Sequence, residues 1–129
     1  MAKILIVDDD PDIIEAATLF LQREGYSVVS AHNRQSGMAA VEREKPELLI
    51  LDVMMEQPDD GIAMAQALRA QGNNLPILML TSISSVTGYH FAPDAETIPV
   101  DDFQEKPVQP TVLAEKVKRL LQARESRSC

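Results

Sequence analysis

The chain has 129 residues, of which 45% are hydrophobic and 25% charged, so it suits one globular domain with one core. The formal net charge of −8 argues against a nucleic-acid-binding surface and is compatible with a cation-binding site. We find no apolar run near the ~20 residues of a membrane span and no basic-then-apolar leader, so we expect a cytoplasmic protein. The single cysteine, Cys129, excludes an intramolecular disulfide framework.

Short apolar runs alternate with helical patterns along the chain. The expected strands are residues 3–7, 26–31, 48–53, 77–80 and 103–105. The expected helices are residues 11–24, 33–44 and 61–70, and a last helix that starts near Pro110. Pro11 suits the first turn of the first helix, Asp10 suits its N-cap, and Gly25 ends it. Strands that alternate with helices predict an α/β fold, with a parallel sheet covered by helices on both faces.

Polar and charged side chains stand at the carboxyl ends of these strands. Asp8 and Asp9 follow the first strand, and Asp52 lies at the end of the third. Thr81 follows the fourth strand and Lys106 the fifth. Because ligands of open parallel sheets bind in the crevice beyond the carboxyl ends of the strands, we expect these five residues to meet there. The three aspartates would form a pocket of oxygen ligands whose mutual repulsion a Mg²⁺ ion could neutralise.

Each of these residues also has an ordinary interpretation. Asp8 could be a solvated loop acid, Thr81 a turn residue and Lys106 an exposed lysine. Asp52 is harder to explain in this way, because the segment LLILDV places a charge inside an apolar strand, where burial is costly. The joint pattern is therefore stronger evidence for a site than any single residue.

Four segments in this order resemble the receiver domain of bacterial two-component response regulators: ILIVDDDPDI, LLILDVMM, ILMLTS and DDFQEKP. The resemblance covers residues 3 to about 123. It implies a doubly wound, five-stranded parallel sheet with the flavodoxin-like order 2-1-3-4-5. It also implies a phosphoacceptor signalling module that receives a phosphoryl group from a histidine kinase or phosphotransfer protein. The phosphorylated form would change binding to a downstream protein, and neither nucleic acid nor a membrane is expected as a partner.

By this resemblance, Asp52 is the phosphoacceptor and forms an aspartyl phosphate in a Mg²⁺-dependent reaction. Asp9 would bind Mg²⁺ directly, and Asp8 would bind it directly or through water. The backbone carbonyl of Met54 would complete the protein ligands. The metal would bridge the acceptor and phosphoryl oxygens and neutralise charge during transfer.

The resemblance also implies a switch. Lys106 would pair with the phosphoryl oxygens, and the Thr81 hydroxyl would donate to them. Phe103 occupies the switch-aromatic position and would turn inward when Thr81 moves toward the phosphate. The protein would then be no enzyme beyond its own phosphorylation and slow autodephosphorylation. We expect slow hydrolysis because Met54 and Ile83, which would flank the path of the attacking water, cannot orient it by hydrogen bonding.

The stretch between the fourth and fifth strands departs from the family pattern. Receivers normally have a fourth helix here, but residues 82–102 contain Gly88, Pro93 and Pro99 and no sustained helical apolar period. We expect this helix to be missing or shortened to about two turns, because glycine and proline disfavour helix interiors. The remainder is expected to form a packed loop.

The expected domain organisation is simple. Residues 1–124 would form a stand-alone receiver domain, because no residues remain for an output domain, and residues 125–129 a frayed tail. Two other functions remain open. A Mg²⁺-dependent phosphohydrolase of the haloacid-dehalogenase type uses an Asp-x-Asp motif after the first strand, which Asp8 to Asp10 fits loosely, although Asp12 stands where threonine or valine is expected. A pseudo-receiver would share the fold and never take phosphate, and the presence of every expected chemical group argues against it.

Overall fold

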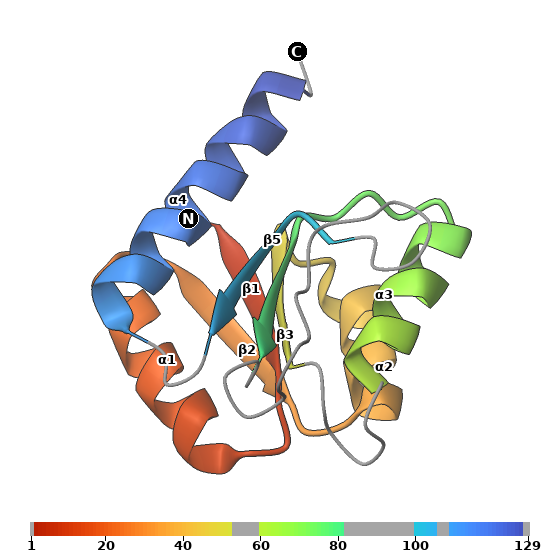
Figure 1. The fold of residues 1–129 in the computed structure, drawn as a ribbon, viewed down its shortest axis with the longest axis horizontal. Helices are drawn as coiled ribbons and strands as arrows, with labels where there is room; N and C mark the ends of the chain where they lie inside the picture. Colours follow the sequence, from red (N-terminus) through yellow and green to blue (C-terminus); the bar gives the residue numbers. More distant parts are fainter. Residues whose placement is uncertain (1, 53–59, 82–99, 106–108, 128–129) are drawn as a thin grey trace, which may run out of the picture.

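The computed structural model describes residues 2–52, 60–81, 100–105 and 109–127. In chain order these form β1 (Lys3–Val7), α1 (Pro11–Arg23), β2 (Ser27–Ala31), α2 (Arg34–Glu44), β3 (Leu48–Asp52), α3 (Asp60–Ala70), β4 (Ile77–Thr81), β5 (Asp102–Glu105) and α4 (Pro110–Arg127). All neighbouring strands pair in parallel, in the order β2-β1-β3-β4-β5 (Figure 1). This order confirms the flavodoxin-like α/β fold expected from the sequence.

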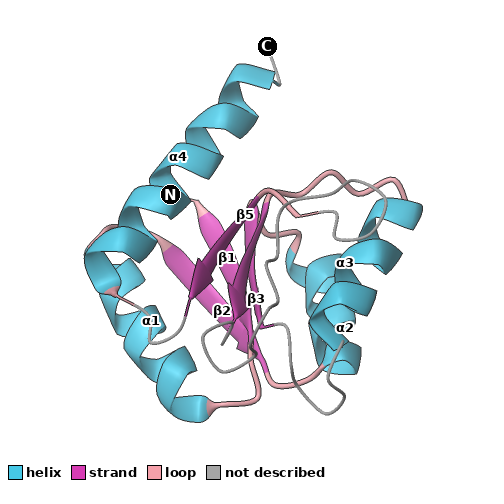
Figure 2. Ribbon diagram, in the orientation of Figure 1, coloured by secondary structure: helices cyan, strands magenta, loops and turns pink. Residues whose placement is uncertain are grey.

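The sheet lies between two layers of helices. Figure 2 shows α1 and α4 on one face and α2 and α3 on the other. Each face has its own apolar core, and β3 is buried at all five of its positions. Burial on both faces explains why the sequence of β3 is an almost uninterrupted apolar run, since neither face of a central parallel strand meets water. A charge at the end of such a strand is therefore costly unless the fold provides for it.

The start of α1 follows the N-cap chemistry expected from the sequence. The Asp10 side chain accepts a hydrogen bond from the Asp12 backbone N–H at 2.9 Å, and Pro11 occupies the first turn. This confirms Asp10 as the N-cap. Because the cap fixes the path of the chain directly after β1, it also fixes the direction in which the preceding acids project.

Close packing and capping place α2 against the sheet. Asn33 and Ser36 form a capping box at its start, and Lys45 ends it in the left-handed conformation with φ of 48°. A Cβ atom on Gly37 would lie 3.0 Å from both methyl groups of Val7 and 3.1 Å from Met64. Glycine at this position therefore lets the helix approach β1 at the residue before the acid pair.

Several boundaries differ from those expected. Thr81 is the last residue of β4 and not the first residue after it. β5 begins at Asp102, one residue earlier than expected. The final helix continues to Arg127, three residues past the expected domain end at 124. No glycine or proline occurs between Gln122 and Arg127 to end the helix.

Other expectations fall outside the described residues. These are the missing or shortened fourth helix, within residues 82–99, together with Met54, Ile83, Lys106 and Cys129. In the described part of the chain, none of the helices has both the length and the apolar character needed to cross a membrane.

Candidate functional site

Three aspartates come together at the carboxyl edge of the sheet. β1 and β3 are parallel neighbours, with Val7 level with Leu51, so the residues that follow at their carboxyl ends are adjacent. Asp8, Asp9 and Asp52 each offer a carboxylate oxygen, and these oxygens all lie within 4.8 Å of one another. The fold thus produces the juxtaposition that the order of strands predicted.

The three carboxylates differ in exposure. Asp8 is fully buried, Asp52 is 4% exposed, and Asp9 is exposed to solvent. The Asp10 backbone N–H donates to Asp8 Oδ1 at 2.9 Å, and the Asp8 N–H donates to the Ala31 carbonyl at 3.2 Å. Asp8 is therefore held by the backbone on both sides, while Asp9 forms the open side of the cluster.

The chemistry of this donor set fits a small divalent cation. Mg²⁺ prefers oxygen ligands and is usually bound by one or two carboxylates together with waters and phosphate oxygens. Here two buried carboxylates, Asp8 and Asp52, lie beside an exposed one, Asp9, that is open to water. A cation would also offset the repulsion among three acids held this close together.

The remaining predicted residues lie on the neighbouring strands or outside the described residues. Thr81 ends β4, one residue beyond Leu80, the residue that pairs with Asp52. Phe103 lies in β5 and pairs with Met79 of β4. The structure therefore brings Thr81 to the same edge of the sheet as Asp52. Met54 and Lys106 fall in the undescribed segments 53–59 and 106–108.

One polar contact at this edge was not foreseen. Asp60, the first residue of α3, is 5% exposed, and its Oδ1 lies 3.7 Å from Nη1 of Arg34 at the start of α2. Both helices begin on the carboxyl side of the sheet, so the pair links two helix N-termini on one face. The sequence carried no signal for it, because the two residues lie on different helices and each resembles an ordinary surface charge.

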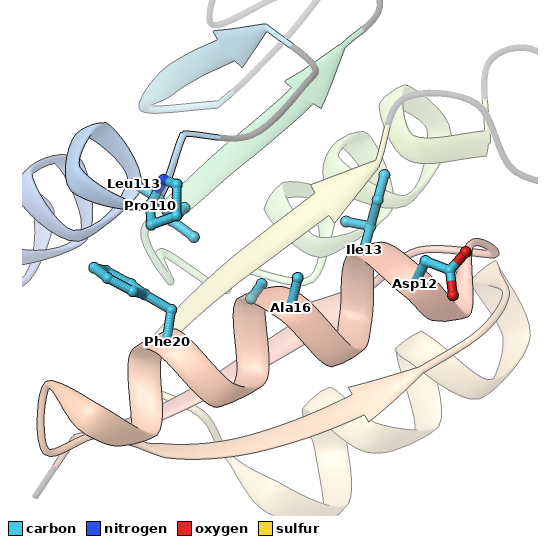
Figure 3. A pocket seen from close by; sticks show the side chains of 7 residues that line it. Asp12, Ile13, Ala16, Phe20, Pro110 and Leu113 are labelled. Atoms are coloured by element: carbon cyan, nitrogen blue, oxygen red, sulfur yellow. The ribbon is translucent and has the colours of Figure 1, made fainter.

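A separate pocket of about 210 Å³ lies between α1 and α4 (Figure 3). Phe20 on α1 and Leu113 on α4 extend toward each other across it, and Asp12 stands at its other end. Its other lining residues are Ile13, Ala16, Ala17 and Pro110. Because the lining is almost entirely apolar, this pocket suits apolar contacts and is distinct from the acid cluster.

Comparisons with known proteins agree with this geometry. The response regulator receiver domain family matches residues 4–118. The alkaline phosphatase synthesis transcriptional regulatory protein PhoP of Bacillus subtilis is 35% identical over 127 residues, covering 95% of this chain and 50% of that protein. The regulatory protein VanRc of Enterococcus gallinarum is 36% identical over 124 residues, covering 92% of this chain and 49% of that protein.

Solved structures agree as well. The CheY-like response regulator receiver domain protein of Methanospirillum hungatei superimposes with a TM-score of 0.81 at 27% identity, covering 98% of each chain. The chain spans about half the length of the curated relatives it matches. It follows from the matched residues, the sheet order and the acid cluster that this chain belongs to the response regulator receiver domain family.

Proposed function

We propose that Asp52 accepts a phosphoryl group from the phosphohistidine of a histidine kinase or phosphotransfer protein, and that the added charge changes binding to a downstream protein. Receiver domains are phosphoacceptor signalling modules and not classical enzymes. The observation that carries the assignment is the position of Asp52. It is a carboxylate only 4% exposed, at the end of a buried strand and within 4.8 Å of two further acids.

The transfer is a single displacement. A carboxylate oxygen of Asp52 attacks the phosphorus, and the new P–O bond forms as the P–N bond of the donor breaks. The imidazole nitrogen leaves with the electron pair and takes a proton. Asp8, Asp9 and the Met54 carbonyl would hold Mg²⁺, which when bound supplies charge neutralisation on the phosphoryl oxygens. The hydrogen bond from the Asp10 N–H to Asp8 Oδ1 supports this role, because it holds the carboxylate in place.

The output side of the proposal concerns β4 and β5. The Thr81 hydroxyl and the Lys106 ammonium would pair with the phosphoryl oxygens, and Phe103 would turn inward as Thr81 moves. An added charge of about −1.5 to −2, the value for other phosphorylated side chains, is enough to bias a bistable segment of this kind.

Incubation with acetyl phosphate and Mg²⁺, followed by intact mass measurement, tests the proposal. We expect the wild type to gain one phosphoryl group and Asp52→Asn to gain none. The matched control is Asp10→Asn, which keeps an N-cap side chain and should react like wild type. Equal phosphorylation of Asp52→Asn would contradict the assignment. Catalytic release of phosphate without an adduct would support the phosphohydrolase, and no reaction would support the pseudo-receiver.

Mg²⁺ binding has its own test. A ligand that binds only the folded protein, at 100 times its dissociation constant, adds about 2.7 kcal/mol to the free energy of unfolding. The melting temperature should therefore rise with Mg²⁺, and Asp9→Ala should lose most of this rise. Similar shifts in the wild type and the variant would exclude Asp9 as a main ligand.

The lifetime of the aspartyl phosphate follows from two side chains. Assistance by a general acid or base is typically worth about 10²–10⁴-fold in rate, and neither Met54 nor Ile83 can provide it. We therefore propose slow autodephosphorylation, with faster phosphate loss in Met54→Asn combined with Ile83→Glu. If that double variant loses phosphate no faster than wild type, these two residues do not set the rate.

The match over residues 4–118 supports residues 1–124 as the receiver domain. Because the proposed donor is a histidine kinase or phosphotransfer protein, we also propose that the domain acts in the cytoplasm.

A further inference from the structure

The apolar side chains of β5 do little to fix its register against β4. It lies at the edge of the sheet, with β4 as its neighbour, and spans only the four residues Asp102–Glu105. The register of a strand is normally set by its pattern of apolar side chains, but DFQE contains one apolar residue, and Gln104, the buried residue among the strand's described side chains, is polar. A slip of one residue would turn Phe103 to the other face and move every following residue by about 3.3 Å.

Asp101, directly before β5, supplies what the apolar pattern lacks. Its backbone N–H donates to the Ile77 carbonyl at 2.9 Å, and its Oδ2 accepts from the Ile77 N–H at 2.8 Å. One residue thus satisfies both backbone polar groups of the first residue of β4. In a regular ladder the Ile77 N–H would bind a backbone carbonyl of the neighbouring strand, but here it binds the Asp101 carboxylate. This contact therefore forms only when β5 pairs with β4 in the observed register.

Arg69, in the last turn of α3, completes the contact. Its Nη2 donates to Asp101 Oδ2 at 3.0 Å, and its Nη1 donates to the carbonyls of Leu75 at 2.7 Å and Asn73 at 3.1 Å. The Arg69 and Asp101 side chains are only 23% and 22% exposed. The guanidinium therefore ties the end of α3 and the segment leading into β4 to the residue before β5.

The next residue makes a different kind of contact. Asp102 lies 3.5 Å from Lys116 and 3.2 Å from Arg119, both on α4, and Arg119 is 64% exposed. Asp101 thus bonds toward α3 on one face of the sheet, while Asp102 bonds toward α4 on the other. Because this contact consists of ion pairs with α4, one of them to an exposed partner, it supplies a matched control.

We infer that Asp101, held by Arg69, is a positioning residue for phosphoryl transfer, because it fixes the register of β5 and so the place of Lys106 relative to Asp52. This inference rests on the proposed function. Lys106 follows the end of β5 directly in the sequence, so its distance from the acid cluster depends on the strand's register. Asp101 touches no reacting atom and acts through Lys106.

The experiment measures the rate of phosphorylation and the affinity for Mg²⁺, because the inference predicts that only the rate changes. By the inference, the rate of phosphorylation by acetyl phosphate at saturating Mg²⁺ depends on β5, whereas Mg²⁺ affinity depends on Asp8, Asp9 and Asp52, at the carboxyl ends of β1 and β3. A misplacement of about 1 Å can cost up to about 100-fold in rate, so we expect Asp101→Ala, which removes the acceptor oxygen for both the Ile77 N–H and Arg69, to react roughly 10- to 100-fold more slowly. Its Mg²⁺ dissociation constant should stay within about twofold of wild type, because β1 and β3, which position the acid cluster, are not neighbours of β5 in the sheet.

Three comparisons make the result decisive. Asp102→Ala should react nearly as fast as wild type. Arg69→Met combined with Asp101→Ala should slow the reaction by less than the product of the two single effects, since the two changes share the Arg69–Asp101 contact. In a Lys106→Ala background, Asp101→Ala should have no further effect on the rate.

The inference is wrong if Asp101→Ala reacts at the wild-type rate, or if its Mg²⁺ affinity falls in parallel with its rate. It is also wrong if the variant slows the Lys106→Ala protein further. Failure of the proposed function gives a different result, because the wild type itself would then take up no phosphoryl group.

Discussion

Replacing Asp52 by asparagine should stabilise the protein in the absence of divalent cations. Two unit charges 4.8 Å apart, the limit that bounds the three carboxylate oxygens, repel by about 3.5 kcal/mol at an effective dielectric of 20. Asp9 is exposed and its charge is screened by water, so most of the relief comes from the buried pair, Asp8 with Asp52. Asparagine keeps the shape of the side chain but changes its hydrogen bonding, and we therefore expect a net gain of about 1–2 kcal/mol.

Urea denaturation of the wild type and Asp52→Asn, each in EDTA and in excess Mg²⁺, measures this effect. In EDTA the variant should have the larger free energy of unfolding, and Mg²⁺ should narrow or reverse the difference because it binds the wild type more tightly. Asp10→Asn is the control, since it removes a nearby charge while keeping the N-cap, and should change stability little. A variant less stable than wild type in EDTA would refute repulsion as the dominant effect at Asp52.

Three further predictions concern α2 and its ends. Gly37→Ala should lower the free energy of unfolding by about 1 kcal/mol, because the pressure of the new methyl group on Val7 costs about 2 kcal/mol and the gain in helix propensity offsets only about half of it. Ala39→Gly, on the exposed side of the same helix, should cost about as much through helix propensity alone, and urea denaturation of both variants checks the pair. Lys45→Gly should raise stability by ~0.5 kcal/mol in thermal denaturation, because glycine adopts the positive φ without steric cost. Hydrogen bonds from Arg43 and Lys3 hold the pKa of Glu44 below its ordinary value of 4.5, so their contribution to stability is present above about pH 5 and is lost as pH falls through the lowered pKa. The stability difference between wild type and Glu44→Gln should therefore shrink between pH 6 and pH 3, and a constant difference would contradict it.

The acid cluster could be predicted from the sequence because every signal for it is local. Asp8 and Asp9 directly follow an apolar run, and Asp52 ends another, so strand assignment alone places all three at the carboxyl edge. The parallel arrangement then brings β1 and β3 together. The N-cap at Asp10 was equally local, since it needs only a short polar side chain before Pro11.

The contacts that organise the rest of the sheet could not be predicted in this way. Asp101 meets Ile77 across 24 positions and Arg69 across 32, and no short motif marks either contact. In the sequence, Arg69 resembles a solvated helix charge and Asp101 a loop acid. Their partial burial and shared hydrogen bonds arise only when α3, β4 and β5 pack together.

Apolar burial and charged contacts each hold a different part of the site in position. Apolar burial sets the positions of β1 and β3 so firmly that the fold can place repelling carboxylates at their ends, where a cation would relieve the strain. β5 lies at the sheet edge, and Gln104, the buried residue among its described side chains, is polar. A strand fixed by a few charged contacts can shift at a smaller cost in free energy than one fixed by a core. We therefore expect movement at β5, where the proposed switch residue Phe103 lies, to disturb β1 and β3 less than movement within a central strand would.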